Sequence, residues 1–255
     1  CVEKTFVSIW ETTADGAVIT LPLREGFAYD FTVDWGDGSA PSQVTSYDDP
    51  NRSHTYAIAG EHTIRIDGLM EAIHLACNDQ RILLAVPNLG SVGWKSFESA
   101  FSFCSALETV VGGDTANVTD MNGMFMGTTS ANPDTSGWDT ANVTDMNRMF
   151  MGAASATPNT SGWDTSNVTD MSYMFLYADS ANPDTSGWNT ANVTNMGVMF
   201  MGATSANPDT IGWDTANVTE MSGMFIYAAS ANPDTSGWDT ANVISMGAMF
   251  DGATS

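Results

Sequence analysis

The stretch DTANVTDMNRMFMGAASATPNTSGW, from Asp139 to Trp163, decides the fold, because it recurs along the second half of the chain. Successive copies start 25 residues apart, with no insertion between them. The copies begin at Asp114, Asp139, Asp164, Asn189, Asp214 and Asp239. A strict period of this length is typical of a solenoid, in which each copy forms one coil and packs against its neighbours.

Large apolar residues occupy fixed places in the unit. Val143, Met146, Met149, Phe150 and Trp163 stand in columns that repeat from copy to copy, and they predict one inward stripe per coil. The i, i+3, i+4 spacing of Met146, Met149 and Phe150 predicts a short helical turn. The Gly-Trp pair that closes the unit predicts a turn followed by a short extended segment. One strand and one helical turn per coil indicate a solenoid of leucine-rich-repeat type.

The two residues between the methionines of the unit vary freely, which is what an outward-facing position permits. Arg148, Tyr173 and Val198 occupy the second of these positions in three successive copies. We expect this variable column to be a binding surface, with the specific contacts made through Arg148 and Tyr173. Unconstrained drift of an exposed position is the alternative interpretation.

The N-terminal region has different chemistry. Apolar and polar residues alternate in Phe31–Trp35 and again in Thr63–Asp67, which predicts two strands. Gly36-Asp37-Gly38 predicts a tight turn directly after the first strand. Together these features predict a small antiparallel β-sandwich.

The sequence therefore divides into three parts and predicts a mainly β protein with short helical turns. Residues 1–70 form the β-sandwich. Residues 71–113 form a capping segment and an irregular first coil, since Trp94–Phe101 matches the repeat only loosely. Residues 114–255 form the solenoid of 25-residue repeats, whose last copy is incomplete.

Two resemblances support this division. The sequences DWGDGS at Asp34–Ser39 and HTY at His54–Tyr56 resemble the polycystic kidney disease (PKD) type of immunoglobulin-like domain. The repeat, as in GWDTSNVTDMSYMF at Gly162–Phe175, resembles the BspA-like leucine-rich-repeat surface proteins of bacteria. These resemblances imply a secreted or surface-anchored protein that serves in adhesion and protein interaction, without catalysis. This chain has Thr135, Thr160 and Thr185 at a position where the BspA-like repeats often have an aliphatic residue. At this position the chain departs from the BspA-like pattern.

Charge narrows the choice of partners. The chain has 30 acidic and 7 basic side chains, for a net charge of −23. This excess repels nucleic acids and anionic membranes, so we expect a protein or a glycan on another surface as the partner. Only 15% of the residues are charged, and a surface of Thr, Ser, Asn and Gly is typical of extracellular repeat proteins.

The three cysteines suggest an anchor and a crosslink. Cys1 is the kind of residue that bacterial lipoprotein processing leaves for acylation, so a lipid anchor there would be the chain's only contact with a membrane. A chain cut elsewhere is the alternative. If Cys1 is acylated, Cys77 and Cys104 remain as one disulfide pair, with packed free thiols as the other possibility.

Stacked aspartates raise the question of bound calcium, the one cofactor that the sequence suggests. Like charges about 5 Å apart in neighbouring coils repel, unless cations or backbone amides neutralise them. Calcium prefers oxygen ligands of this kind. The candidate ligands are Asp34, Asp37, Asp139, Asp145, Asp164 and Asp170. Hydrogen bonds that cap turns are the alternative role for all of them.

Catalysis is not expected. A glycoside-hydrolysing carboxylate pair needs two different environments, whereas each repeat aspartate has nearly the same surroundings in every coil. We therefore expect a non-catalytic surface protein that acts in adhesion or as a structural module. The alternatives are a glycan-binding or glycan-hydrolysing protein, or an ice-binding solenoid that presents the stacked threonines and asparagines of Thr140–Thr144.

The sequence stops at Ser255, partway through a coil, without a polar capping repeat. An open solenoid end exposes backbone groups and apolar columns. We therefore expect either that the native chain continues or that this end docks onto another subunit. Repeated head-to-tail docking would produce an open fibre.

Overall fold

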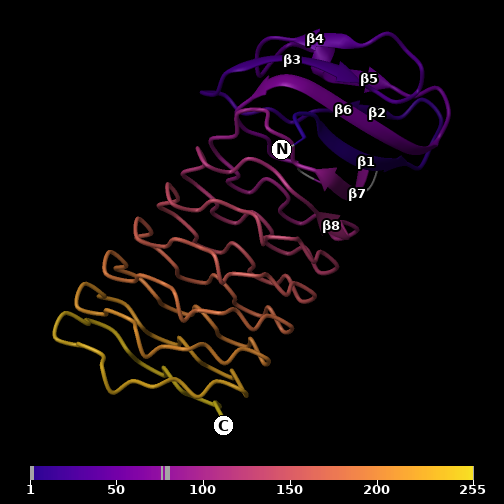
Figure 1. Cartoon of the computed structure of the whole chain (residues 1–255). Helices are drawn as coiled ribbons and strands as arrows, with labels where there is room; N and C mark the ends of the chain where they lie inside the picture. The colour runs from indigo at the N-terminus through magenta and orange to yellow at the C-terminus, as the bar shows by residue number, and fades with distance from the viewer. Residues whose placement is uncertain (1–2, 76, 78–80, 255) are drawn as a thin grey trace.

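The computed structural model describes residues 3–75, 77 and 81–254. The protein is mainly β, as predicted, with an open six-stranded sheet near the N-terminus and a stack of coils that extends away from it (Figure 1). The strands are β1 (Phe6–Thr12), β2 (Val18–Thr20), β3 (Tyr29–Asp34), β4 (Ser42–Val44), β5 (Ser53–Thr55), β6 (Gly60–Met70), β7 (Arg81–Asn88) and β8 (Thr109–Val110). Within the described residues, the one helix is the short 3-10 helix η1 (Pro50–Arg52).

The strands of the large sheet lie in the order β4-β3-β6-β1-β7-β8, and β2 pairs with β5 in a separate two-stranded sheet. Neighbouring strands of the large sheet are antiparallel, except that β7 and β8 are parallel. In β3, Tyr29, Phe31 and Val33 are buried, whereas the residues between them are exposed. This alternation follows the sequence pattern, because one face of the strand packs on the core while the other meets solvent.

The two N-terminal motifs meet in the fold. Tyr56 donates a hydrogen bond from its hydroxyl to the carbonyl of Trp35, at 2.8 Å, and the His54 ring stacks on the Trp35 ring with centroids 5.1 Å apart. Gly36 has a left-handed φ of 78°, and a Cβ there would lie 2.3 Å from the carbonyl oxygen of Thr63. Glycine is therefore required where this turn crosses β6.

The sheet and the coils share one hydrophobic core. Strand β7, from the segment between the two regular regions, pairs with β1 on one side and with β8 on the other. The buried cluster continues without a break from Phe6 in β1 to Ala231 in the later coils. The N-terminal sheet therefore covers the first coil of the stack.

Successive coils are joined by one parallel bridge each. The bridged pairs are Ala72 with Ser96, Ser96 with Asp120, Asp120 with Asp145, Asp145 with Asp170, Asp170 with Asn195, Asn195 with Glu220, and Glu220 with Ser245. Inside the stack, each Phe ring of the repeat lies on the ring of the next coil, as Phe175 does on Phe200 with centroids 5.4 Å apart. Trp188 and Trp213 stack in the same way at 6.4 Å. The predicted apolar columns are thus the core.

The predicted helical turn is replaced by a chain of hydrogen-bonded turns. The N–H groups of Met146, Arg148, Phe150 and Gly152 donate to carbonyls of the next coil, whereas the intervening N–H groups bond back within the segment. Arg148 and Gly152 have left-handed φ values of 57° and 70°, which interrupt a helix. The i, i+3, i+4 face is buried as predicted, but half of the amides bond between coils.

Threonine hydroxyls also join the coils. Thr135 donates from Oγ1 to the carbonyl of Asn159 at 2.8 Å, and Thr160 and Thr185 make the equivalent bonds at 2.7 and 2.6 Å. All three side chains are buried. An aliphatic residue would leave this carbonyl without its bond, so the departure from the BspA-like pattern has a structural reason.

Candidate binding surface

The coils differ mainly in the segment 147–154 and its equivalents, which we call the turn face. Its two left-handed positions are four residues apart. The predicted variable column occupies the first of them, where Arg148, Tyr173 and Val198 have φ values of 57°, 60° and 60°. The Arg148 guanidinium carbon lies 4.9 Å from the centre of the Tyr173 ring, a cation–π contact between neighbouring coils.

The second left-handed position carries residues that the sequence analysis missed. Glycine fills it in most coils, but Tyr177 and Tyr227 fill it in two, with φ values of 54° and 55°. Their side chains are 51% and 56% exposed. The sequence clue was the change from a Met-Phe-x-Gly pattern to Met-Phe-x-Tyr in these coils.

Each exposed ring lies on a glycine of the next coil. A Cβ at Gly202 would come within 2.3 Å of Cδ1 of Tyr177, and a Cβ at Gly252 would meet the Tyr227 ring at the same distance. The ring therefore occupies space that any other residue at the glycine position would fill. In the leading coil, the exposed ring of Phe103 has the same relation to Gly127.

Polar residues follow the two tyrosines in the chain. Asp179 and Ser180 follow Tyr177 and are exposed, whereas Ala229 and Ser230 follow Tyr227. In the coil between them, Thr204 donates from its hydroxyl to the Asp179 carbonyl at 3.4 Å and accepts at its own carbonyl from the Ser230 hydroxyl at 2.7 Å. This coil has Gly202 at the second left-handed position, so it separates the two aromatic rings.

The threonine and asparagine columns are engaged between coils. Asn142 donates from its amide to the carbonyl of Ala116 at 2.8 Å, and Asn167, Asn192, Asn217 and Asn242 make the same bond one coil further along each time. Thr144 donates to the Thr119 carbonyl at 3.1 Å. These side chains join neighbouring coils. Their N–H and O–H groups therefore donate within the protein and are not directed at the water lattice of an ice surface.

The candidate calcium ligands accept hydrogen bonds from nearby backbone. In the repeats, Asp139, Asp145, Asp164 and Asp170 each accept from the N–H two residues further on. The hydrogen bonds from Ser166 lower the pKa of Asp164. Across the residues that the structure describes, there is no group of three or more His, Cys, Asp or Glu side chains that could hold a metal ion.

The N-terminal aspartates have similar contacts. Asp34 accepts from the N–H of Gly36, and Asp37 accepts from the N–H of Ser39. Asp37 also lies 2.7 Å from Nε2 of His54, measured from its Oδ2. The hydrogen bonds from Ser39 and His54 hold the pKa of Asp37 well below its ordinary value. Both aspartates thus stabilise the turn that follows β3.

Cys77 and Cys104 form a disulfide bond in the structure, which ties the segment before β7 to the first coil. Cys1, the expected lipid anchor, lies outside the described residues. None of the helices in the described part of the chain is long and apolar enough to cross a membrane.

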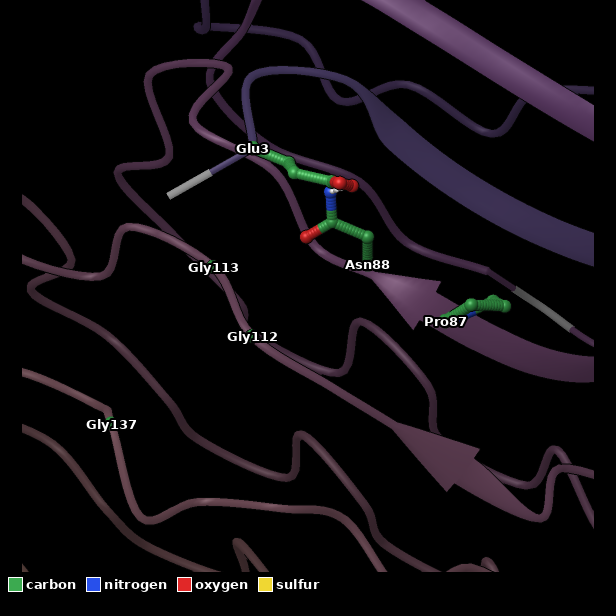
Figure 2. A pocket seen from close by; sticks show the side chains of 6 residues that line it. All are labelled: Glu3, Pro87, Asn88, Gly112, Gly113 and Gly137. Atoms are coloured by element: carbon green, nitrogen blue, oxygen red, sulfur yellow. Dashed lines mark hydrogen bonds between the residues drawn. The ribbon is translucent and has the colours of Figure 1, made fainter. Parts of the chain in front are cut away.

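A cleft of about 300 Å³ lies where the sheet meets the coils (Figure 2). It is lined by Glu3, Pro87, Asn88, Gly112, Gly113 and Gly137. The side chains of Glu3 and Asn88 point toward each other, and Asn88 donates from Nδ2 to the Glu3 carboxylate at 3.3 Å. The rest of the lining is glycine and proline, so the cleft does not assemble an acid, a base and a nucleophile.

Comparison with known proteins places the coils in a family. A family model described as "Mycoplasma protein of unknown function, DUF285" matches residues 95–211 and 156–255. The chain belongs to this family. The match covers the repeats and not the N-terminal sheet, and it fits a surface repeat protein in general terms. Searches of the curated proteins and of the solved structures found no match.

Proposed function

We propose that this protein is a non-catalytic extracellular or cell-surface protein that binds a partner through the turn face of its coils. In this proposal, the N-terminal sheet is an immunoglobulin-like sandwich of the PKD type, and the coils form a solenoid of leucine-rich-repeat type. The protein partner or glycan lies on another surface, and an acylated Cys1 would attach the N-terminal end to the membrane.

The observation that carries the proposal is the contrast between the core and the turn face. The stacked Phe and Trp columns repeat in every coil and hold the coils together. Arg148, Tyr173 and Tyr177 differ from their equivalents in neighbouring coils and lie at the surface. A scaffold of constant core and variable outer positions suits recognition, because side chains can change there without loss of packing.

Binding and turnover assays test this proposal together. The protein is applied to immobilised matrix proteins and glycans, while release of reducing ends from the same glycans is measured. We expect saturable binding without turnover, and binding weakened when Arg148, Tyr173 and Tyr177 are replaced by the Gly of other coils. Turnover that a single Asp→Asn change abolishes would contradict the proposal and favour a glycan hydrolase.

Head-to-tail assembly is a second candidate function. The coils stack on one another through their ring columns, as Phe175 does on Phe200 with centroids 5.4 Å apart. Coils of separate copies would stack through the same contacts. Because the chains are strongly acidic, calcium should promote bundling of such fibres by screening their charge.

Sedimentation velocity tests the assembly, with and without calcium. We expect species larger than a monomer, whose proportion rises with protein concentration. A strictly monomeric protein at high concentration in both conditions would contradict this second function.

A further inference from the structure

We propose that Tyr177 and Tyr227 form a platform on which a neutral, extended polysaccharide of the β-1,4-linked type stacks its sugar rings. This inference rests on the proposed binding function and names its ligand class. Both tyrosines are exposed and stand at left-handed backbone positions.

The two tyrosines have a strained backbone conformation. A bulky side chain at a left-handed φ is uncommon, since this region disfavours residues with a Cβ. Glycine occupies the same position at Gly127, Gly152 and Gly202 and carries no such strain. Strained residues persist where the surrounding structure holds them, and they cluster at binding sites.

Each ring packs against a glycine of the next coil. The Tyr177 ring rests on the backbone of Gly202, and the Tyr227 ring rests on that of Gly252. About half of each side chain remains open to solvent. A ring fixed in this way loses little freedom on binding, so stacking a ligand on it costs little entropy.

The spacing of the two tyrosines fits an extended polysaccharide. Tyr177 and Tyr227 lie two coils apart, next to Phe175 and Phe225 in the core. The core rings Phe175, Phe200 and Phe225 are separated by 5.4 and 5.6 Å, so the tyrosines lie roughly 11 Å apart along the stack. In an extended β-1,4-linked chain, successive sugars face opposite ways, so the same face recurs at every second sugar. One sugar in such a chain is about as long as one coil is thick.

The chemistry around the rings suits a sugar. Apolar sugar faces stack on aromatic rings, while their hydroxyl edges need hydrogen-bonding partners. The exposed Asp179 carboxylate and Ser180 hydroxyl lie two and three residues from Tyr177. A protein partner would favour a continuous apolar patch instead. The net charge of −23 disfavours anionic glycans, which leaves a neutral one.

Ile211 provides a matched control outside the turn face. Its side chain is 73% exposed, and other coils have Ser136, Ser161 and Ser186 at the same position. Changing Ile211 to serine therefore replaces an exposed apolar side chain by the residue of neighbouring coils, as the tyrosine changes do, but it leaves the platform intact.

The test measures depletion of the protein from solution by microcrystalline cellulose and by chitin. We expect wild-type protein and Ile211→Ser to bind equally. We expect the double variant Tyr177→Gly, Tyr227→Gly to bind about tenfold or more weakly. Glycine at both positions matches neighbouring coils, so thermal melting of the double variant should stay at or above that of wild type.

The glycan inference would be overturned if wild-type protein bound neither polysaccharide, or if the double variant bound as tightly as wild type. Binding to heparin in preference to cellulose and chitin would also overturn it. If matrix proteins bind wild type and the double variant equally while neither polysaccharide binds, the glycan inference fails and the proposed binding function stands. If nothing binds in any assay, both fail.

Discussion

The contact between Tyr177 and Gly202 allows a sharp test of how neighbouring coils depend on each other. In Gly202→Ala, the new Cβ would lie 2.3 Å from Cδ1 of the Tyr177 ring, and the backbone there has a φ of 69°. An L-residue at a left-handed position costs about 1–2 kcal/mol. The ring must also swing into solvent, and losing the packing of its half-buried surface costs about 1 kcal/mol.

We therefore expect Gly202→Ala to lower the free energy of unfolding by about 2–3 kcal/mol. In a Tyr177→Gly background the ring is gone, so only the backbone cost of about 1–2 kcal/mol should remain. The difference of about 1 kcal/mol is the coupling between the two positions, which a double-mutant cycle in urea measures directly.

Gly212→Ala is the matched control. Gly212 has no left-handed φ, and a Cβ there would meet nothing within 4 Å. Alanine at such a glycine should leave stability unchanged or raise it by about 0.4–1 kcal/mol. Equal destabilisation by Gly202→Ala and Gly212→Ala, or the same cost of Gly202→Ala with and without Tyr177, would refute the reasoning.

Three further predictions concern the contacts that hold the protein together. Thr185→Val should lower the free energy of unfolding by about 1 kcal/mol in urea, because it removes the hydrogen bond from the buried Thr185 to the Asp209 carbonyl of the next coil, whereas Thr185→Ser should keep most of the stability. The hydrogen bonds from Ser39 lower the pKa of Asp37, so the stabilisation from this carboxylate is present above its unfolded pKa of about 3.9 and is lost as the pH falls further. Asp37→Asn should therefore flatten the acid side of the stability curve, and an unchanged curve would contradict this role. Replacing Cys77 and Cys104 by serine should cost about 2–4 kcal/mol, since the disulfide closes a loop with a sequence separation of 27, and thermal melts with and without reductant should then converge for the variant.

The repeat predicted the core well because its period fixes which side chains of neighbouring coils lie over one another. Phe150 recurs every 25 residues, so in any coil stack it must lie over its own copies, and the structure places these rings 5.5 Å apart. The same logic predicted the mainly β architecture. Predicting the buried columns needs no knowledge of the local backbone, because the stacking of coils alone determines which columns are buried.

The local backbone was predicted less well. The i, i+3, i+4 spacing of Met146, Met149 and Phe150 fits a helix, but the same spacing also suits a run of turns with the same buried face. Bonds between coils decide the outcome, since Met146 and Phe150 donate to the next coil and not to the preceding turn. A pattern read within one unit cannot include partners that lie 24 residues away.

The two tyrosines were missed for a related reason. In the sequence, the position of Tyr177 in the repeat is simply variable. The structure shows that the Tyr177 ring lies on Gly202. That contact sets a rule across coils: a ring at this position needs glycine in the following coil, so rings cannot occupy adjacent coils. Tyr177 is followed by Gly202, and Tyr227 by Gly252, as the rule requires. The shortest spacing that the fold allows between such rings is therefore two coils. In an extended β-1,4-linked chain, two sugars is also the spacing at which the same sugar face turns again toward the tyrosine rings.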